Sequence, residues 1–120
     1  MRACNYSCAF NGIQLKLIDA AHIIPVNHEK STDETKNGVA LCALHHRAYD
    51  SGLVTFNETY KAYPNNSRMK NLKEIGHEGG IDKFLADLRP LLRVPPSVSD
   101  RPHTKYVSFA NKLRGWENLR

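Results

Sequence analysis

A strand, a polar loop and a helix follow one another in a single short segment, and this succession constrains the fold more than any other feature. Apolar residues alternate over 13–26, as in a β-strand, and Pro25 closes the run because proline cannot donate to a sheet ladder. The stretch 27–38 is polar and ends in Asn-Gly, which predicts a loop. An apolar piece leads from there into a helix at about 43–51. Gly52 stands where a left-handed helix cap belongs.

The rest of the chain predicts further short elements. These are a strand at 53–56 and helices at about 68–75, 81–88 and 102–113. We find no internal repeat and no low-complexity tract. We therefore expect one α+β domain over residues 1–120, with a core at about 8–57 and a helical C-terminal extension at about 67–116.

The composition of the chain indicates its cellular compartment and the kind of molecule that it binds. The 120 residues include 17 Lys+Arg and 12 Asp+Glu, so the net charge is +5, which suits a polyanion such as nucleic acid. No apolar run reaches the ~18 residues of a membrane span, and no signal peptide is recognisable. Three cysteines are an odd number, which argues against a disulfide framework and for the cytoplasm. Because Cys4 lies so near the start, we also expect an upstream targeting domain.

Four residues in the core segment carry side chains that suit chemistry. His22 lies on the predicted strand, and Asn37 ends the loop. His46 and Asp50 are four residues apart, so a helix presents both on the same face, where an imidazole and a carboxylate can hold a divalent ion. The plainer alternatives are a hydrogen-bonded core histidine, an Asn-Gly turn and a surface ion pair.

The order and spacing of these residues resemble the HNH endonuclease family, which has the ββα-metal fold. The matching stretches are AAHIIP at 20–25, NG at 37–38 and LCALHHRAYD at 41–50. Residues 19–57 are most similar to the HNH domains of restriction endonucleases, and a weaker similarity continues to Arg114-Gly115-Trp116. The resemblance implies a ββα-metal core with additional C-terminal helices.

The resemblance also implies roles for the four residues. His22 would be the general base that takes a proton from the attacking water, since a neutral imidazole with a pKa near ~6.5 suits that task. His46 and Asp50 would hold Mg²⁺ or Mn²⁺, which would stabilise charge on the scissile phosphate. Asn37 would bond across the loop and fix the strand that carries the base.

The chain departs from the family pattern at Ala21. Many HNH enzymes have an aspartate or histidine there that binds the metal, and alanine cannot. Asp19 shares the strand parity of position 21 and lies about 7 Å from it along the strand. We expect its carboxylate to fill the gap through a bulge or a bridging water. The alternative is an exposed acidic residue at a strand edge.

A structural zinc is also implied by the resemblance, because related domains often carry two Cys-x-x-Cys knuckles. Cys42 and His45 fit the second knuckle, whereas Asn11 stands where Cys8 would need a partner. Cys4 could replace it, giving a four-ligand site of Cys4, Cys8, Cys42 and His45. The alternatives are three unligated thiols, or a zinc shared with the active site, because Cys42 and His46 are also four residues apart.

These expectations combine into a function. The chain is predicted to be a metal-dependent endonuclease that hydrolyses DNA, most consistently double-stranded DNA, in restriction or phage defence. Arg47, Lys16 and Lys36 are candidates for phosphate contacts, with a solvated surface as the alternative. Cutting both strands with one small site favours a homodimer. The competing hypothesis is a zinc-stabilised DNA-binding module with an HNH-like fold whose catalysis is impaired at Ala21.

Overall fold

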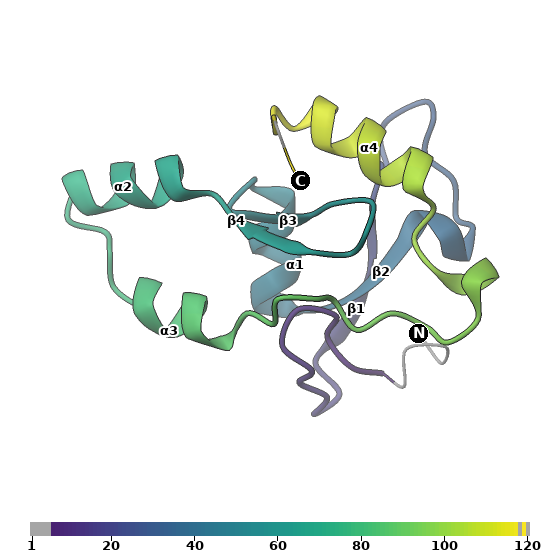
Figure 1. Ribbon diagram of the computed structural model, residues 1–120, viewed down its shortest axis with the longest axis horizontal. Helices are drawn as coiled ribbons and strands as arrows, with labels where there is room; N and C mark the ends of the chain where they lie inside the picture. The colour runs from purple at the N-terminus through teal and green to yellow at the C-terminus, as the bar shows by residue number, and fades with distance from the viewer. Residues whose placement is uncertain (1–5, 118, 120) are drawn as a thin grey trace.

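The computed structural model describes residues 6–117 and residue 119, and its first half is a β-hairpin covered by a helix (Figure 1). Strand β1 (Ile18–His22) pairs antiparallel with β2 (Gly38–Cys42), and the pairing runs from Ile18 opposite Cys42 to His22 opposite Gly38. The connecting loop ends in the 3-10 turn η2 (Thr35–Asn37). Helix α1 (Ala43–Asp50) follows β2 without a break.

The first strand is shorter than predicted. Residues 14–17 form a turn, in which Leu15 and Lys16 have positive φ angles of 51° and 56°. Leu15 is 73% exposed and Leu17 is 54% exposed, so these leucines do not face the core. The prediction of a strand over 13–26 was therefore wrong at its start, because the apolar residues there lie on an exposed turn and not on a pleated face. It was also wrong at its end, because the strand stops at His22.

Helix α1 packs on the hairpin with the side chains of His45, Ala48 and Tyr49 buried. Cys42 is its N-cap, and the thiol accepts a hydrogen bond from the backbone N–H of His45. The helix ends near Gly52, whose φ of +79° is the left-handed conformation predicted for that position.

The remaining elements build a second hairpin and three peripheral helices. They are β3 (Val54–Phe56), β4 (Ala62–Pro64), α2 (Asn66–Glu74), α3 (Ile81–Asp87), the 3-10 turn η3 (Val98–Asp100) and α4 (Thr104–Leu113). The predicted strand and the three predicted helices are confirmed within about two residues at each end. Strand β4 was missed because three residues are too few to show a period.

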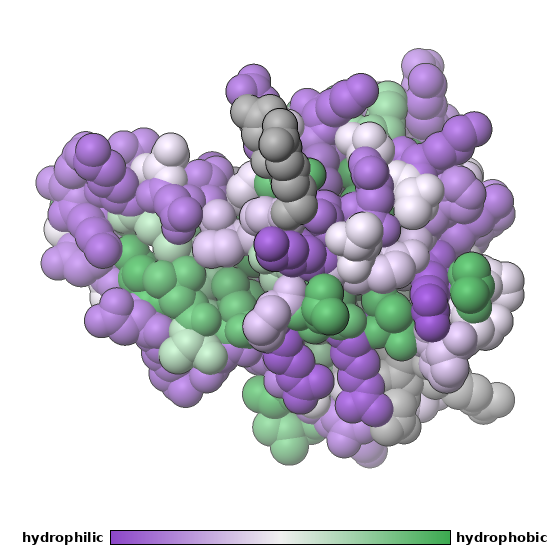
Figure 2. Space-filling view, in the orientation of Figure 1, coloured by the Kyte–Doolittle hydropathy of each residue, from purple (hydrophilic) through white to green (hydrophobic). Residues whose placement is uncertain are grey.

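The core lies between the two hairpins and α1. Tyr49 and Phe56 stack with ring centroids 5.8 Å apart, and Phe10 meets Phe56 edge-on at 6.2 Å. Helices α2 and α3 lie to one side of this core, and apolar side chains reach the surface between them (Figure 2). Ile75, at the end of α2, and Leu85, in α3, are exposed. None of the described helices is long and apolar enough to cross a membrane.

Candidate active site and metal-binding residues

Asp19, His46 and Asp50 form a cluster where α1 crosses the face of β1. Asp19 comes from the strand, and its Oδ2 lies 2.9 Å from Nδ1 of His46. Asp50, one helical turn after His46, places its Oδ2 3.4 Å from Nε2 of the same ring. The imidazole is about one third exposed and both carboxylates are about half exposed, so a solvated ion can reach them.

The two carboxylates lie on opposite edges of the imidazole. An ion bound at Nε2 would therefore lie beside Asp50, whereas Asp19 would remain on Nδ1. A carboxylate on the second ring nitrogen of a metal-binding histidine fixes the tautomer and the ring orientation. Neither a bulge nor a bridging water is needed to bring Asp19 to this cluster. Ala21, the position of the missing family ligand, is 1% exposed and contributes a methyl group.

His22 ends β1 and lies apart from this cluster. Its Nε2 is 3.0 Å from Oδ1 of Asp33, a carboxylate in the following loop that is 97% exposed. His22 and Asp19 are three residues apart on β1, about 10 Å along the strand. The described contacts therefore do not join the predicted base to the predicted ligands directly.

Asn37 ties the loop to the backbone just after His22. Its Oδ1 accepts from the N–H of Ile24 at 2.9 Å, and its Nδ2 donates to the carbonyl of Thr32 at 2.8 Å and to the hydroxyl of Ser31 at 3.3 Å. Its own carbonyl accepts from the N–H of Ile23 at 2.9 Å. The side chain is 1% exposed, so this amide is satisfied inside the protein and is not available to a ligand.

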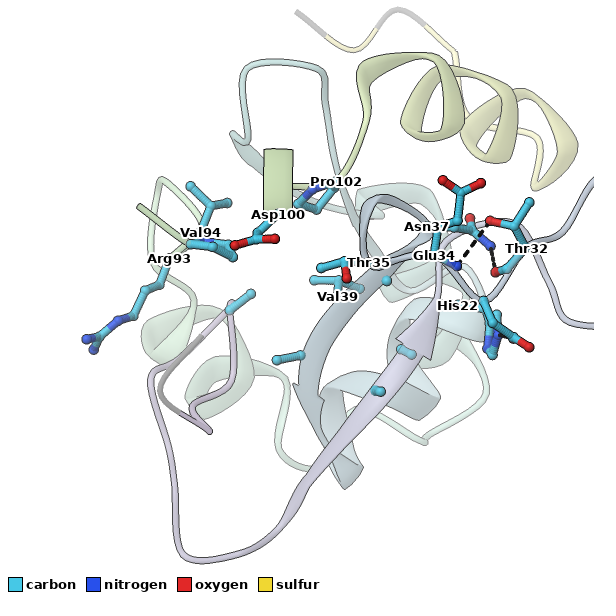
Figure 3. A pocket seen from close by; sticks show the side chains of 17 residues that line it. His22, Thr32, Glu34, Thr35, Asn37, Val39, Arg93, Val94, Asp100 and Pro102 are labelled. Carbon is cyan, nitrogen blue, oxygen red and sulfur yellow. Dashed lines mark hydrogen bonds and ion pairs between the residues drawn. The ribbon is translucent and has the colours of Figure 1, made fainter. Parts of the chain in front are cut away.

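A cavity of about 300 Å³ opens beside His22, between the loop at 32–37 and the segment at 93–102 (Figure 3). Val39 and small alanine side chains line its base, and the carboxylate of Asp100 points into it from the C-terminal segment. Asn37 and Thr32 lie at the end where His22 is found (Figure 3). The C-terminal extension thus forms one wall of the space next to the predicted base.

Cys8, Cys42 and His45 form a second, buried cluster. Among the residues that the structure describes, these three are the group whose ligand atoms all lie within 4.8 Å of one another. Nδ1 of His45 is 3.1 Å from Sγ of Cys42 and 3.7 Å from Sγ of Cys8. Two thiolates and an imidazole are typical zinc ligands, so this donor set fits zinc. The predicted fourth ligand, Cys4, lies outside the described residues.

The geometry of this cluster separates it from the Asp19 cluster. Cys42 contacts His45 and caps α1 through its sulfur, so its thiol is directed to His45 and not to His46. Asn11, which stands at the second ligand position of the first knuckle, uses its Oδ1 to accept from the N–H of Ile13 at 3.1 Å. It is therefore engaged in a turn of the chain.

Comparisons with known proteins agree with this architecture. Residues 8–57, which contain both hairpin strands, α1 and β3, match the family described as HNH endonuclease. These residues are therefore similar to an HNH endonuclease domain. The predicted fold class, an α+β fold with a ββα-metal core and additional C-terminal helices, is confirmed.

A solved structure is similar over nearly the whole chain. It is described as "Modification dependent TagI restriction endonuclease", and it superposes with a TM-score of 0.65 at 16% sequence identity, covering 98% of this chain and 36% of that chain. The chain thus spans about a third of that protein, and the likeness includes the C-terminal helices. None of the curated proteins compared with the chain matches it.

The structure adds two residues to the candidate site that the sequence did not indicate. Asp33, the partner of His22, was one polar residue among many in the loop. Arg114 contacts Asp50 with its Nη2 3.6 Å from Oδ1. The weak family similarity at Arg114-Gly115-Trp116 was the one sequence signal that pointed to Arg114. That similarity did not assign a role to the residue.

The predicted phosphate contacts lie at different places on the domain. Arg47 is exposed on α1 directly after His46, and Lys16 is exposed in the turn before β1. Lys36 is already paired, because its Nζ lies 3.2 Å from Oε2 of Glu34 and 5.9 Å from the ring centre of Tyr106. Arg47 is therefore the one of the three that stands next to the Asp19 cluster in sequence.

Tyr49 is buried beside Arg114, and its ionisation predicts how the free energy of unfolding changes at alkaline pH. Burial raises its pKa to about 12, while the nearby Arg114 charge lowers it and Asp50 raises it. A folded-state pKa above the ordinary value of about 10 means that this contribution to stability is complete below pH 10 and is lost as pH rises towards 12. The stability difference between wild type and Tyr49→Phe should therefore shrink over this range, by about 1.4 kcal/mol per pH unit.

Denaturant titrations of both proteins at pH 8, 10, 11 and 12 measure this difference. A difference that stays constant from pH 8 to 12 would contradict the prediction.

Proposed function

We propose that the chain is a metal-dependent endonuclease that hydrolyses DNA phosphodiester bonds, acting in restriction or phage defence. The observation that carries the proposal is the meeting of Asp19, His46 and Asp50 on an HNH domain whose first strand ends in His22. The similar fold of a restriction endonuclease supports the biological setting. A cytoplasmic location remains our prediction.

In this proposal His46, through Nε2, and Asp50 would hold Mg²⁺ or Mn²⁺. When bound, such an ion supplies positive charge that stabilises the phosphate and the leaving oxygen in the transition state. His22, as neutral imidazole, takes a proton from the attacking water. Nε2 faces the highly exposed Asp33, and water can take the place of this carboxylate when the substrate binds.

Asn37 serves the reaction by holding His22 in place. Its side chain and its carbonyl bond to the two residues that follow His22, so the end of β1 has a fixed backbone. Water can then replace Asp33 at Nε2 of His22 without movement of the strand. This role needs no contact between Asn37 and DNA.

Asp19 orients His46 in this proposal rather than binding the ion itself. It accepts the Nδ1–H of His46, which leaves Nε2 free for the ion. Asp19→Ala should weaken Mn²⁺ binding about 10- to 100-fold, the usual cost of losing such a partner. Asp19→Asn should cost much less, because its amide oxygen can still accept this hydrogen bond.

Mn²⁺ titrations of the DNA-free protein, followed by electron paramagnetic resonance, measure both variants. If Asp19→Asn weakens binding as much as Asp19→Ala does, the carboxylate is a direct ligand and the orienting role is wrong.

Plasmid nicking tests the proposed function. Supercoiled plasmid should be cut with Mg²⁺ or Mn²⁺ and remain intact with EDTA, and the products should carry the 5′-phosphate and 3′-hydroxyl ends implied by the family resemblance. Protein that leaves plasmid intact with Mg²⁺, Mn²⁺ and Zn²⁺ would contradict the proposal. Adding an upstream targeting domain and recovering cleavage would identify a nuclease that depends on that domain.

A second candidate is a zinc-stabilised DNA-binding module, which is favoured by the methyl group at Ala21. It would retain the Cys8–Cys42–His45 cluster and bind double-stranded DNA without cutting it. Gel-shift and nicking assays on the same preparation separate the two candidates.

We further propose that residues 1–120 act as one domain and cut both strands as a homodimer on DNA. The packing of α4 on the second hairpin supports the single domain, since Asn111 donates to the carbonyl of Phe56 at 2.9 Å. Sedimentation that detects monomer alone, with and without DNA, would contradict the dimer.

A further inference from the structure

Arg114, the residue that caps the end of α4, reaches into the HNH domain with its guanidinium. Nη1 donates to the carbonyl of Ile23 at 2.8 Å and to the hydroxyl of Tyr49 at 3.3 Å. Nη2 lies 3.6 Å from Oδ1 of Asp50. The guanidinium carbon lies 4.4 Å from the centre of the Tyr49 ring, so the charge also sits over the aromatic face.

These contacts join the two parts of the proposed active site. Ile23 directly follows the predicted base, His22, and Asp50 is one of the two residues proposed above to hold the ion. His22 and the ligands come from different elements and do not touch each other. A rigid, planar guanidinium that binds both elements at once fixes their distance.

The contact with Asp50 also sets the orientation of its carboxylate. Oδ1 faces Arg114, and Oδ2 lies 3.4 Å from Nε2 of His46. Each oxygen therefore has a separate partner, and Oδ2 is held on the side where an ion at Nε2 would lie. Without Arg114 the carboxylate is free to rotate away from this side.

The guanidinium is not free to bind DNA. The side chain of Arg114 is 8% exposed, Nη1 donates to Ile23 and Tyr49, and Nη2 pairs with Asp50. Helix α4, whose C-cap is Arg114, is held by two hydrogen bonds of Asn111. Asn111 donates to the carbonyl of Phe56 and accepts from the hydroxyl of Thr55. The position of Arg114 is thus set by buried contacts.

We propose that Arg114 is a positioning residue of the nuclease site, which fixes Asp50 towards the ion and α1 relative to the strand of His22. The proposal rests on the proposed function, and it extends the site beyond residues 8–57 into the C-terminal helices. It predicts that the HNH-matching segment without α4 has a poorly formed ion site.

Mn²⁺ binding by the DNA-free, full chain tests the proposal, with Arg114→Met and Arg114→Lys as variants. Methionine keeps an apolar stem over Tyr49 and removes the charge, so Mn²⁺ affinity should fall about 10-fold or more. Lysine keeps the charge but cannot bind Ile23 and Asp50 with one planar group, so its affinity should be intermediate. With saturating metal, kcat should fall and KM for DNA should not change.

Arg101→Ala is the matched control. Arg101, like Arg114, makes two hydrogen bonds, here to the backbone carbonyls of Pro95 at 2.7 Å and Pro96 at 3.3 Å, but it does not contact α1 in the described structure. It should lower thermal stability without changing Mn²⁺ affinity. This comparison distinguishes the positioning role from a general loss of stability.

The outcomes separate this proposal from the proposed function. Wild-type Mn²⁺ affinity and kcat in Arg114→Met, or an equal loss of affinity in Arg101→Ala, would overturn the positioning role. A wild-type protein that binds Mn²⁺ but never cuts DNA would overturn the endonuclease proposal alone, and Arg114 would then be judged by affinity. If Arg114→Met does not fold, an Arg114→Lys variant with wild-type affinity would overturn the role.

Discussion

His22→Ala should reduce metal-dependent plasmid nicking by about two to four orders of magnitude, the usual contribution of a general base. Alanine removes the imidazole that accepts the water proton, whereas the backbone around it is held by Asn37 and should not move. Initial nicking rates at saturating Mg²⁺ measure the effect. Circular dichroism establishes that the variant is folded.

Metal binding makes this prediction more specific. His22 pairs with Asp33, whereas His46 pairs with Asp19 and Asp50, so His22→Ala should bind Mn²⁺ as tightly as wild type. His46→Ala should lose both binding and cleavage, because the imidazole lies between both carboxylates. His77→Ala, an exposed histidine between α2 and α3, is the matched control and should cut normally. Normal cutting by His22→Ala would exclude His22 as the base.

Cys42→Ser should remove a bound zinc and lower the melting temperature by more than about 10 °C. Zinc sites contribute strongly to folding in small domains, and a loss of even about 3 kcal/mol lowers the melting temperature of a domain of this size by roughly 10–15 °C. Purified wild-type protein should contain about one zinc per chain, as measured by mass spectrometry of the metal content. Cys8→Ser and His45→Gln should have the same effect, because all three residues surround one point.

Val54→Ala is the control for this experiment. Val54 is fully buried in the same core, so alanine should destabilise the protein while zinc content stays at one per chain. Zinc-free wild-type protein with an unchanged melting temperature would show that the three residues are unligated. Cys4→Ser tests the predicted fourth ligand, since zinc affinity should fall if Cys4 closes the site.

The sequence correctly predicted those features of the structure that depend on neighbouring residues. The cap at Gly52 and the placement of His46 and Asp50 on one helical face depend on residues within a few positions of each other. Asp19, which shares the strand parity of Ala21, contacts His46 on α1. Local alternation failed at Leu15 and Leu17, because it cannot distinguish a buried strand face from an exposed turn.

The tertiary structure alone decided how separate elements meet around the site. The sequence determined which residues could serve as base, ligands and zinc donors, since their spacing along one strand and one helix is a local property. It did not determine that Arg114 contacts Asp50 and the carbonyl of Ile23. The hydrogen bond to Ile23 joins residues that are 91 positions apart. Such contacts depend on how α4 docks on the second hairpin, and docking is set by the shape and burial of whole faces rather than by any short pattern of residues.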